Sequence, residues 1–480
     1  MVEKNITELK TGKAAGSDEL VAEHLKNAHP IISVVLNKLF NIFIENVYVP
    51  SDFGMGLIIP IPKCGNSANC HKIDNFRGIT ISPVISKVFE HCLYSLFADY
   101  LKSSANQFGF KKGKGTRDAI FAVSESVGLY VNNGSTVNIC SLDISKAFDK
   151  INHNVLFLKL MKRNTPICFI NILVNWYSKC FCQVKWESAL SNILFLHNGI
   201  RQGGILSPFL FALYVDDVLI TLVNSGLGLN FYGINLGAIM YADDILLLAG
   251  SILNLQKLIV IAEHCFDEIN LKINIKKCFA TRIGSKCKAE CANLELLNDD
   301  IPWKSEIKYL GIMFRQASTL KVNLHSNKVK FFQAFNSIYA KLGKACNVDT
   351  IVHLLKSNCL STLLFNLESI NLSKSDINNL KFPVSRAFVK IFHIKETVSI
   401  NWCQYYMHVM PIDFMLDARK LKFVRKMSNS KCYIMQILFS KSANDILVNI
   451  CNKYGLSAKV SQGKFLFTLW EKFYNLLTDS

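Results

Sequence analysis

Glycine and proline are scarce, with 24 glycines and 10 prolines in 480 residues, and no long polar tract is present. This composition excludes a collagen-like chain and an intrinsically disordered one. No repeat period stands out, which excludes a solenoid. Half of the residues are apolar, enough for a large buried core, and the length allows about three domains of ~150 residues.

The sequence also lacks the marks of a secreted, disulfide-bonded protein. It has 16 cysteines but no CxxC pair, and MVEKNITELK at its start is not the basic-then-apolar pattern of a signal peptide. We therefore expect a reducing, intracellular environment. Two groups are conceivable zinc ligands, but each lacks a matching second half, which favours ordinary thiols. The groups are Cys64, Cys70 and His71, and Cys287 with Cys291.

One apolar run, residues 203–223, is long enough to resemble a membrane span. It contains Pro208 and the pair Asp216 and Asp217, and each aspartate costs about 2.5–3.5 kcal/mol at a bilayer centre. We therefore expect a buried helix, with no transmembrane segment and no membrane partner.

Acidic residues are fewer than basic ones, 36 against 54, which gives a net charge of +18. Residues 312–480 contain 23 Lys and Arg but only 9 Asp and Glu. Such an excess points to a polyanionic partner. Within it, Arg419, Lys422 and Lys426 fall on one side of a helical pattern, which is either a phosphate-binding surface or a solvated face. The charge asymmetry favours nucleic acid.

Strands and helices interleave in the first two-thirds of the chain and helices dominate the last third, which predicts an α+β core with a helical appendage. Helices are expected near 30–46, 86–102 and 252–269, and strands at 57–64, 136–144, 271–283 and 308–314. Residues 238–250 read as two short strands around an acidic turn. Asp149 is expected to cap a following helix, and Pro383 and Pro411 are expected to break the helical region.

Acids at strand ends are the strongest chemical feature. Asp143 closes one apolar strand, and Asp243 and Asp244 occupy the turn of YADD (241–244). Three acids from two distant segments can hold a pair of divalent cations, and Mg²⁺ prefers oxygen ligands. Ordinary polar turn residues are the alternative, but the pair lies in an otherwise apolar hairpin. The similar YVDD (214–217) falls in mid-helix, where its acids are expected to face solvent, so we assign catalysis to YADD.

Nine sequence blocks occur in an order that resembles the reverse transcriptases of non-LTR (LINE-like, jockey-like) retrotransposons, over about residues 8–315. The blocks are LKTGKAAGSDEL (9–20), IPIPKCGN (59–66), NFRGITISPVISKVFE (75–90), NQFGFKKGKGTRDAI (106–120), SLDISKAFDKINH (141–153), NGIRQGGILSPFLFALYVDD (198–217), YADD (241–244), LKINIKKC (271–278) and KYLGI (308–312).

The resemblance implies a right-hand polymerase with fingers at 1–135, an α+β palm with an antiparallel sheet at 136–311, and a helical thumb with a basic extension at 312–480. It implies an RNA-directed DNA polymerase that adds deoxynucleotides to a primer 3′-OH with Mg²⁺, or alternatively Mn²⁺. The implied partners are an RNA template, a DNA primer and dNTP. The lifestyle of such elements implies a nuclear location, and the oligomeric state stays open.

The resemblance also implies catalytic roles. Asp143, Asp243 and Asp244 would bind the metal ions, assisted by the main-chain carbonyl of Ile144. Lys277 would protonate the departing pyrophosphate, although a solvated lysine is the competing interpretation and Lys276 lies next to it.

Further implied roles concern the nucleotide, the template and the primer. Lys63 and Arg77 would clamp the triphosphate, and Phe148 would clash with a ribose 2′-OH, unless it is a core aromatic. Arg201, Gln202 and Gly203 would lie against template and nucleotide, where glycine allows a close approach. Tyr309, Leu310 and Gly311 would grip the primer end.

Two positions depart from the family pattern. Gly78 replaces the usual proline of the NFR block, and Gly204 replaces an acid that often follows RQG, so the rigidity of the clamp is in question. Nothing near the start resembles the nuclease of relatives, which suggests a polymerase core from a partial reading frame. The alternative function is a decayed or domesticated RNA-binding protein of maturase type.

Overall fold

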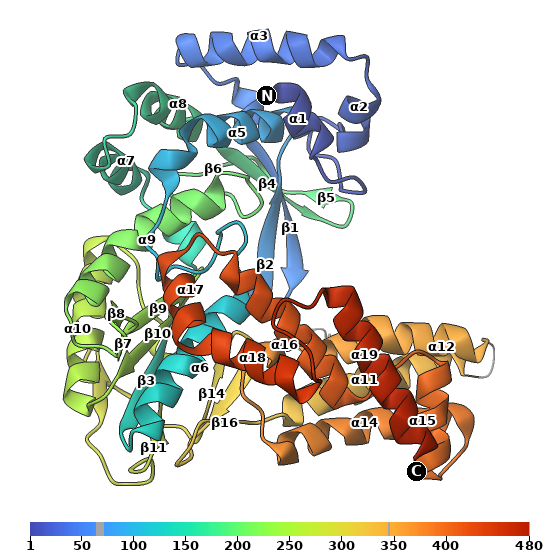
Figure 1. The fold of residues 1–480 in the computed structure, drawn as a ribbon. Helices are drawn as coiled ribbons and strands as arrows, with labels where there is room; N and C mark the ends of the chain where they lie inside the picture. The colour runs from blue at the N-terminus through green and yellow to red at the C-terminus, as the bar shows by residue number, and fades with distance from the viewer. Residues whose placement is uncertain (64–71, 344–345, 480) are drawn as a thin grey trace. The chain divides into compact units, whose positions relative to one another are not determined.

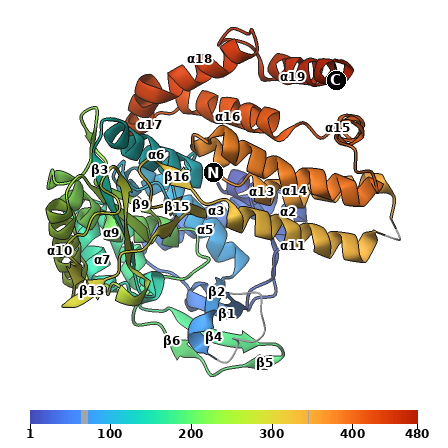
Figure 2. The same ribbon diagram turned by 90° about the horizontal axis from the view of Figure 1, so that it is seen from below.

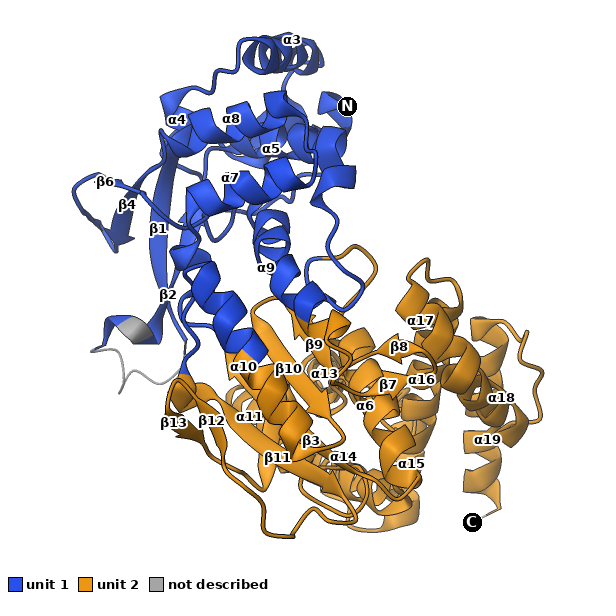
Figure 3. Cartoon of the chain, turned by 90° about the vertical axis from the view of Figure 1, so that its left-hand side faces the viewer, with its two compact units in different colours: residues 1–110, 144–221, 261–274 blue, residues 111–143, 222–260, 275–480 orange. Residues whose placement is uncertain are grey.

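The computed structural model describes residues 1–63, 72–343 and 346–479, which form two compact units. Unit 1 comprises residues 1–110, 144–221 and 261–274, and unit 2 comprises residues 111–143, 222–260 and 275–480 (Figure 3). The chain crosses between the units several times, so neither unit is one continuous stretch of sequence.

Unit 1 is a helical layer attached to a five-stranded sheet. Its helices are α1 (Val2–Thr7), α2 (Ala22–Asn27), α3 (Ile31–Glu45), α4 (Ser51–Gly54), α5 (Val84–Phe97), α7 (His153–Lys162), α8 (Ile167–Tyr177) and most of α9 (Ser207–Asn224). Its strands are β1 (Met55–Pro62), β2 (Phe76–Ile81), β4 (Phe181–Trp186), β5 (Ala189–Leu190) and β6 (Leu194–Phe195). The strand order is β2-β1-β4-β5, with β6 also on β4.

An aromatic cluster forms much of the core of unit 1. Phe40 and Phe43 of α3 contact Phe89 of α5, and Phe89 stacks on Trp176 of α8 with ring centroids 5.6 Å apart. Phe40 and Phe43 are three residues apart, so they lie on one face of α3, the face that packs against α5. The predicted helices at 30–46 and 86–102 are confirmed as helices, with slightly different ends.

Unit 2 contains a four-stranded sheet, several short strands and most of the remaining helices. Its strands are β3 (Thr136–Asp143), β7 (Asn230–Phe231), β8 (Ile234–Asn235), β9 (Ala238–Tyr241), β10 (Asp244–Ala249), β11 (Phe279–Gly284), β12 (Leu294–Leu296), β13 (Asp299–Ile301), β14 (Glu306–Tyr309), β15 (Ile312–Arg315) and β16 (Lys321–Val322). Its helices before residue 320 are α6 (Thr116–Asn132) and the first part of α10 (Ile252–Glu268).

The antiparallel sheet β11-β3-β10-β9 lies at the centre of unit 2. Residues 245–249 of β10 and 137–140 of β3 are buried, as their largely apolar sequences predict for strands covered on both faces. Helix α6 packs on one face of this sheet (Figure 1). The predicted strands at 136–144 and 238–250 are confirmed. The strand predicted at 271–283 is only partly correct, because Ile275–Lys277 form a 3₁₀ turn before β11 begins.

Helices make up the last part of unit 2. They are α11 (His325–Leu342), α12 (Val348–Leu354), α13 (Ser361–Leu363), α14 (Lys374–Phe392), α15 (Thr397–Tyr406), α16 (Ile412–Ser428), α17 (Tyr433–Leu438), α18 (Asn444–Lys453) and α19 (Gln462–Thr478). Figure 2 shows α11, α14 and α16 side by side. Pro411 precedes α16 as predicted, but Pro383 lies inside α14, where burial of its ring offsets the lost backbone hydrogen bond.

The predicted fingers, palm and thumb are continuous ranges of sequence, whereas each compact unit is assembled from separated segments, so the two divisions cannot be compared directly. The division at residues 135 and 311 therefore stays a prediction about function.

Candidate active site

Three carboxylates gather at one end of the central sheet of unit 2. Strand β10 pairs antiparallel with β3 so that Asp244 lies directly opposite Asp143, and Asp244 also pairs with Tyr241 of β9. Asp243 is in the two-residue turn between β9 and β10. Directly opposed residues of neighbouring strands have Cβ atoms about 4.5–5.5 Å apart. The register thus brings together acids that are about one hundred positions apart in the sequence.

The turn that presents Asp243 is strained. Ala242 has φ +59°, a left-handed conformation that a non-glycine residue adopts at a cost of about 1–2 kcal/mol. Tight two-residue hairpins require a positive φ at such a position. The cost is offset by the buried strands on either side, Ala238–Tyr241 and Asp244–Ala249, which hold the turn in place.

The two neighbouring carboxylates raise the pKa of Asp244. The pKa of Asp244 is raised to about 6, mainly because surrounding protein displaces water from its carboxylate and then because Asp243 and Asp143 add negative charge, while Lys308 acts in the opposite direction. Concentrated negative charge of this kind fits a divalent cation. In the described ranges, no three His, Cys, Asp or Glu side chains are close enough to hold an ion by themselves, and Mg²⁺ usually takes waters and substrate phosphates as further ligands.

Lys277 is part of the same cluster. Its Nζ is 3.2 Å from Oδ2 of Asp143, and its side chain is 62% exposed. The 3₁₀ turn Ile275–Lys277 places it there, and within the described residues Lys276 forms no ion pair with this cluster. The structure therefore brings together Lys277 and the three acids that the sequence singled out.

The second acidic pair, in YVDD, is on helix α9 as predicted, but one of its acids does not face solvent. Asp216 is 3% exposed, pairs with Arg163 at 2.5 Å and accepts a hydrogen bond from the Ser104 amide. Asp217 is exposed and pairs with Lys159. The expectation is thus wrong for Asp216, because Arg163, the residue after α7, compensates its burial. The helical pattern of α9 alone does not reveal this partner.

In unit 1, Lys63 and Arg77 project from the β1–β2 hairpin. Arg77 pairs with Ile61, and the Lys63 amide donates to the Asn75 carbonyl at 2.8 Å. Alternate residues of a strand point to the same face, so Lys63 and Arg77 lie on one face of the hairpin. Both side chains are exposed. The remainder of the loop, including Cys64, Cys70 and His71, lies outside the described residues.

Arg201 has a different setting from the one expected. Its guanidinium donates to the Phe53 carbonyl at 2.8 Å and to Glu90 at 3.4 Å, and the two charged side chains are 7% and 4% exposed. The expectation of a template contact is therefore corrected: Arg201 compensates a buried glutamate inside unit 1, and its charge does not reach the surface.

Gln202 and Gly203 lie against strand β2. The Gln202 carbonyl accepts a hydrogen bond from the Thr80 amide at 2.7 Å, and its side-chain amide donates to Asp149 at 3.1 Å. Gly203 has φ +131°, and a Cβ there would be 2.4 Å from the Thr80 carbonyl oxygen. Glycine is therefore required here because the Thr80 backbone of the protein itself lies so close to Gly203.

We expect Gly203→Ala to destabilise the protein by about 3 kcal/mol, because the new methyl group cannot coexist with the Thr80 backbone. Thermal denaturation measures the effect. Gly128→Ala is the matched control, since a Cβ at Gly128 on α6 meets nothing within 4 Å, and this change should leave stability equal or slightly higher. Equal behaviour of the two variants would contradict the close approach.

Phe148 stacks on Phe211 with ring centroids 4.6 Å apart and an interplanar angle of 11°. It is half-buried, so the ring is fixed by packing and still partly accessible. Asp149 is not the predicted helix cap. It lies in the 3₁₀ turn Ala147–Lys150, and the Asn152 side chain caps α7 by accepting hydrogen bonds from the Asn154 and Val155 amides.

Tyr309, Leu310 and Gly311 form the tip of the β14–β15 hairpin. Leu310 and Gly311 have φ +45° and +89°, as a tight two-residue turn requires. Tyr309 is buried, and its hydroxyl has no hydrogen-bond partner among the described residues. Burial, together with the charge of Asp244, raises the pKa of Tyr309.

A segment that the sequence analysis missed supports this hairpin. Asn366 donates to the Leu310 carbonyl at 3.2 Å and accepts a hydrogen bond from Thr116 at the start of α6. Glu368, 1% exposed, pairs with Arg117 at 2.9 Å and Arg419 at 3.1 Å. No local pattern marks these residues, since their partners are far away in the chain.

The basic stripe on α16 is therefore smaller than expected. The Arg419 side chain is 35% exposed and pairs with the buried Glu368, so its charge is partly engaged inside the protein. Lys422 and Lys426 are exposed.

One helix of the described chain, α9, has the length and apolar composition of a membrane span, and 61% of its apolar window is buried within the protein. Core helices meet the same criteria, so this is weak support for a span, and the burial agrees with the predicted core helix.

A family model described as reverse transcriptase (RNA-dependent DNA polymerase) matches residues 61–314. The RNA-directed DNA polymerase from mobile element jockey of Drosophila funebris is 23% identical over 434 residues, 88% of this chain and 45% of that protein. The Pol polyprotein from retrotransposable element R2DM of Drosophila melanogaster is 27% identical over 310 residues, 62% of this chain and 29% of that protein. The chain thus spans less than half the length of these relatives.

Among solved structures, apo telomerase from Candida tropicalis is similar with a TM-score of 0.44 and 12% identity, over 92% of this chain and 74% of that chain. The sequence matches confirm the resemblance to non-LTR retrotransposon polymerases that the nine blocks indicated.

Proposed function

Because the chain belongs to the reverse transcriptase (RNA-dependent DNA polymerase) family, we propose that it adds deoxynucleotides to a primer 3′-OH, with RNA as template. This membership confirms the predicted fold class, an α+β right-hand polymerase. The observation that supports the activity best is the pairing of β3 with β10, which sets Asp143 opposite Asp244 beside Asp243. Acids so placed can stabilise the charge that develops during phosphoryl transfer.

Asp143, Asp243 and Asp244 are the residues that would hold divalent cations, Mg²⁺ or Mn²⁺, with the Ile144 carbonyl as a further oxygen donor. Bound there, such ions would lower the pKa of the primer hydroxyl and neutralise the triphosphate. The carboxylates supply oxygen ligands, and their mutual repulsion is relieved when a cation is present.

Lys277 is the proposed proton donor to the departing pyrophosphate. Its ion pair with Asp143 holds the ammonium group beside the carboxylate cluster. On unit 1, the shared face of Lys63 and Arg77 suits the triphosphate, because a planar guanidinium and a compact ammonium bind phosphate in complementary ways.

Gln202 and Gly203 would border the nascent base pair, and the Tyr309–Gly311 turn would hold the primer end. The backbone amides of a tight turn can face a ligand without a side chain in between. Asn366 is added to this proposal as a positioning residue, since its hydrogen bond to Leu310 fixes the turn.

Phe148 is proposed to exclude ribonucleotides, so Phe148→Val should reduce the preference for deoxynucleotides by about tenfold or more, because a smaller side chain leaves room for a 2′-OH. Competing incorporation of dNTP and rNTP by the parent and variant measures the ratio. A lower melting temperature with an unchanged ratio would show that Phe148 is only a core aromatic stacked on Phe211.

The decisive assay is extension of oligo(dT) on poly(rA) with and without Mg²⁺. Incorporation that depends on the ion supports the polymerase. Retained RNA binding without incorporation would favour the RNA-binding alternative. The proposed fingers (1–135), palm (136–311) and thumb (312–480), the DNA primer, dNTP and RNA partners, and a nuclear location all belong to the same proposal.

A further inference from the structure

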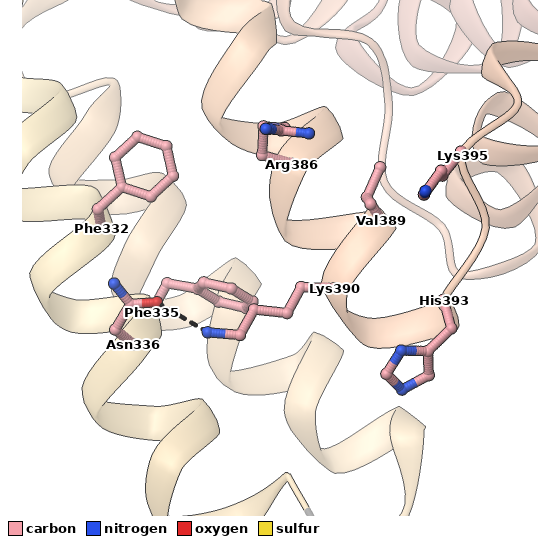
Figure 4. Close-up of a pocket in the computed structure, with 8 residues that line it drawn as sticks. All are labelled: Phe332, Phe335, Asn336, Arg386, Val389, Lys390, His393 and Lys395. Carbon is pink, nitrogen blue, oxygen red and sulfur yellow. Dashed lines mark hydrogen bonds between the residues drawn. The ribbon is translucent and has the colours of Figure 1, made fainter.

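A pocket of about 530 Å³ lies in unit 2 between helices α11 and α14. Figure 4 shows aromatic side chains from α11 on one side and basic side chains from α14 and the residues after it on the other. The residues that define it are Phe332, Phe335, Arg386, Lys390, His393 and Lys395. None of the nine sequence blocks includes them.

The basic side chains that line the pocket have no acidic side chain among the other lining residues. The lining includes no aspartate or glutamate, and α11 contains none along its whole length. Within the described ranges, neither Arg386 nor Lys395 has a carboxylate partner. Other cations of these helices do, such as Lys381, which pairs with Asp413. The nearest acid in sequence, Glu396, accepts a hydrogen bond from Ser399 at the start of α15.

Contacts within the protein hold the side chains of the pocket wall in place. Lys390 donates to Asn336 at 3.2 Å and lies 5.9 Å from the Phe335 ring centroid and 4.8 Å from that of Tyr339. The Tyr339 hydroxyl in turn donates to the Lys390 carbonyl at 2.9 Å. Lys390 is thereby held against the aromatic floor, while Arg386 and Lys395 provide charge at the rim.

An aromatic surface beside uncompensated cations suits a ligand with one flat apolar part and one anionic part. A nucleotide has both, and the pocket has room for one. In a duplex the bases are stacked and paired inside the helix, so they cannot enter a pocket of this size. An unpaired nucleotide can, because its base is free to leave the strand.

We propose that the α11–α14 pocket binds one unpaired nucleotide of a single-stranded nucleic acid, with the base against Phe332 and the phosphate at Arg386 and Lys395. The inference rests on the proposed function for the class of ligand, since a polymerase that copies RNA must hold single-stranded template. The pocket provides such a contact apart from the carboxylate cluster.

The test is fluorescence anisotropy of the full chain with short labelled oligo(rU), oligo(dT) and a hairpin duplex, at one fixed salt concentration. Arg386→Ala/Lys395→Ala and Phe332→Ala should each weaken binding of the single strands by about tenfold, and binding of the duplex by less than about twofold. Lys422→Ala/Lys426→Ala is the charge-matched control on α16 and should affect single strands and duplex to the same small extent. Phe332→Tyr should restore single-strand binding, because it restores the ring.

The proposed nucleotide site would be wrong if both double variants lost affinity equally, or if affinity for single strands and duplex fell equally. Either result would indicate general electrostatic attraction. Unchanged single-strand binding in a variant with the parent's melting temperature would also contradict the site. The oligo(rU) and oligo(dT) arms identify template or displaced DNA as the source of the nucleotide. Binding is measured without DNA synthesis. Failure to extend primers would therefore contradict the proposed function, whereas the binding result for the pocket could still be interpreted.

Discussion

Asp243→Asn should reduce primer extension by at least about 1,000-fold while changing affinity for the template–primer by less than about threefold. The amide keeps the shape of the side chain but removes one of three charges at the end of the β3–β10 pair. Stabilisation of the reacting phosphate depends on that charge, whereas affinity for nucleic acid depends on many other contacts. Single-turnover extension and equilibrium binding, measured on the same preparations, separate the two effects.

Asp217→Asn is the matched control for this experiment. It makes the same chemical change in the other acidic pair, at an exposed residue of α9 that pairs with Lys159. We expect extension within about threefold of the parent, since exposed ion pairs contribute little. If the two variants lost activity equally, or if Asp243→Asn extended primers like the parent, the assignment of catalysis to YADD would be wrong.

The double variant Arg117→Ala/Arg419→Ala should lower the melting temperature by about 5 °C. It leaves the Glu368 carboxylate, 1% exposed, without either of its cations, and an uncompensated buried charge costs about 3–5 kcal/mol. Each single variant retains one cation and should lose less than half of this. Calorimetry of the parent, the singles and the double gives the comparison.

Adding Glu368→Gln to the double variant should restore part of the lost stability, because a neutral amide is easier to bury than a carboxylate. Lys381→Ala provides the control: its ion pair with Asp413 is partly exposed, so the melting temperature should fall by no more than about 2 °C. A double variant as stable as this control would mean that the ion pairs around Glu368 do not hold α6 and α16 to the segment that supports the β14–β15 turn.

The sequence by itself predicted the features that depend on neighbouring residues. The largely apolar sequences of β3 and β10 predict buried strands, and an acid at one end of each strand predicts where the carboxylates lie. The same local patterns distinguished the hairpin YADD from the helical YVDD. The hydrophobic period and a turn of two residues are sufficient for these conclusions, since both act within about ten residues of chain.

Tertiary structure decided the features that depend on a partner from a distant segment. Asp216 and Arg201 are buried because Arg163 and Glu90 compensate them, and part of the charge of Arg419 is engaged by the buried Glu368. Gly203 is required by the Thr80 backbone, and the α11–α14 pocket exists only where two helices meet. Charge compensation, steric contact and concavity are properties of pairs of segments, so a reading of one segment at a time could not reveal them.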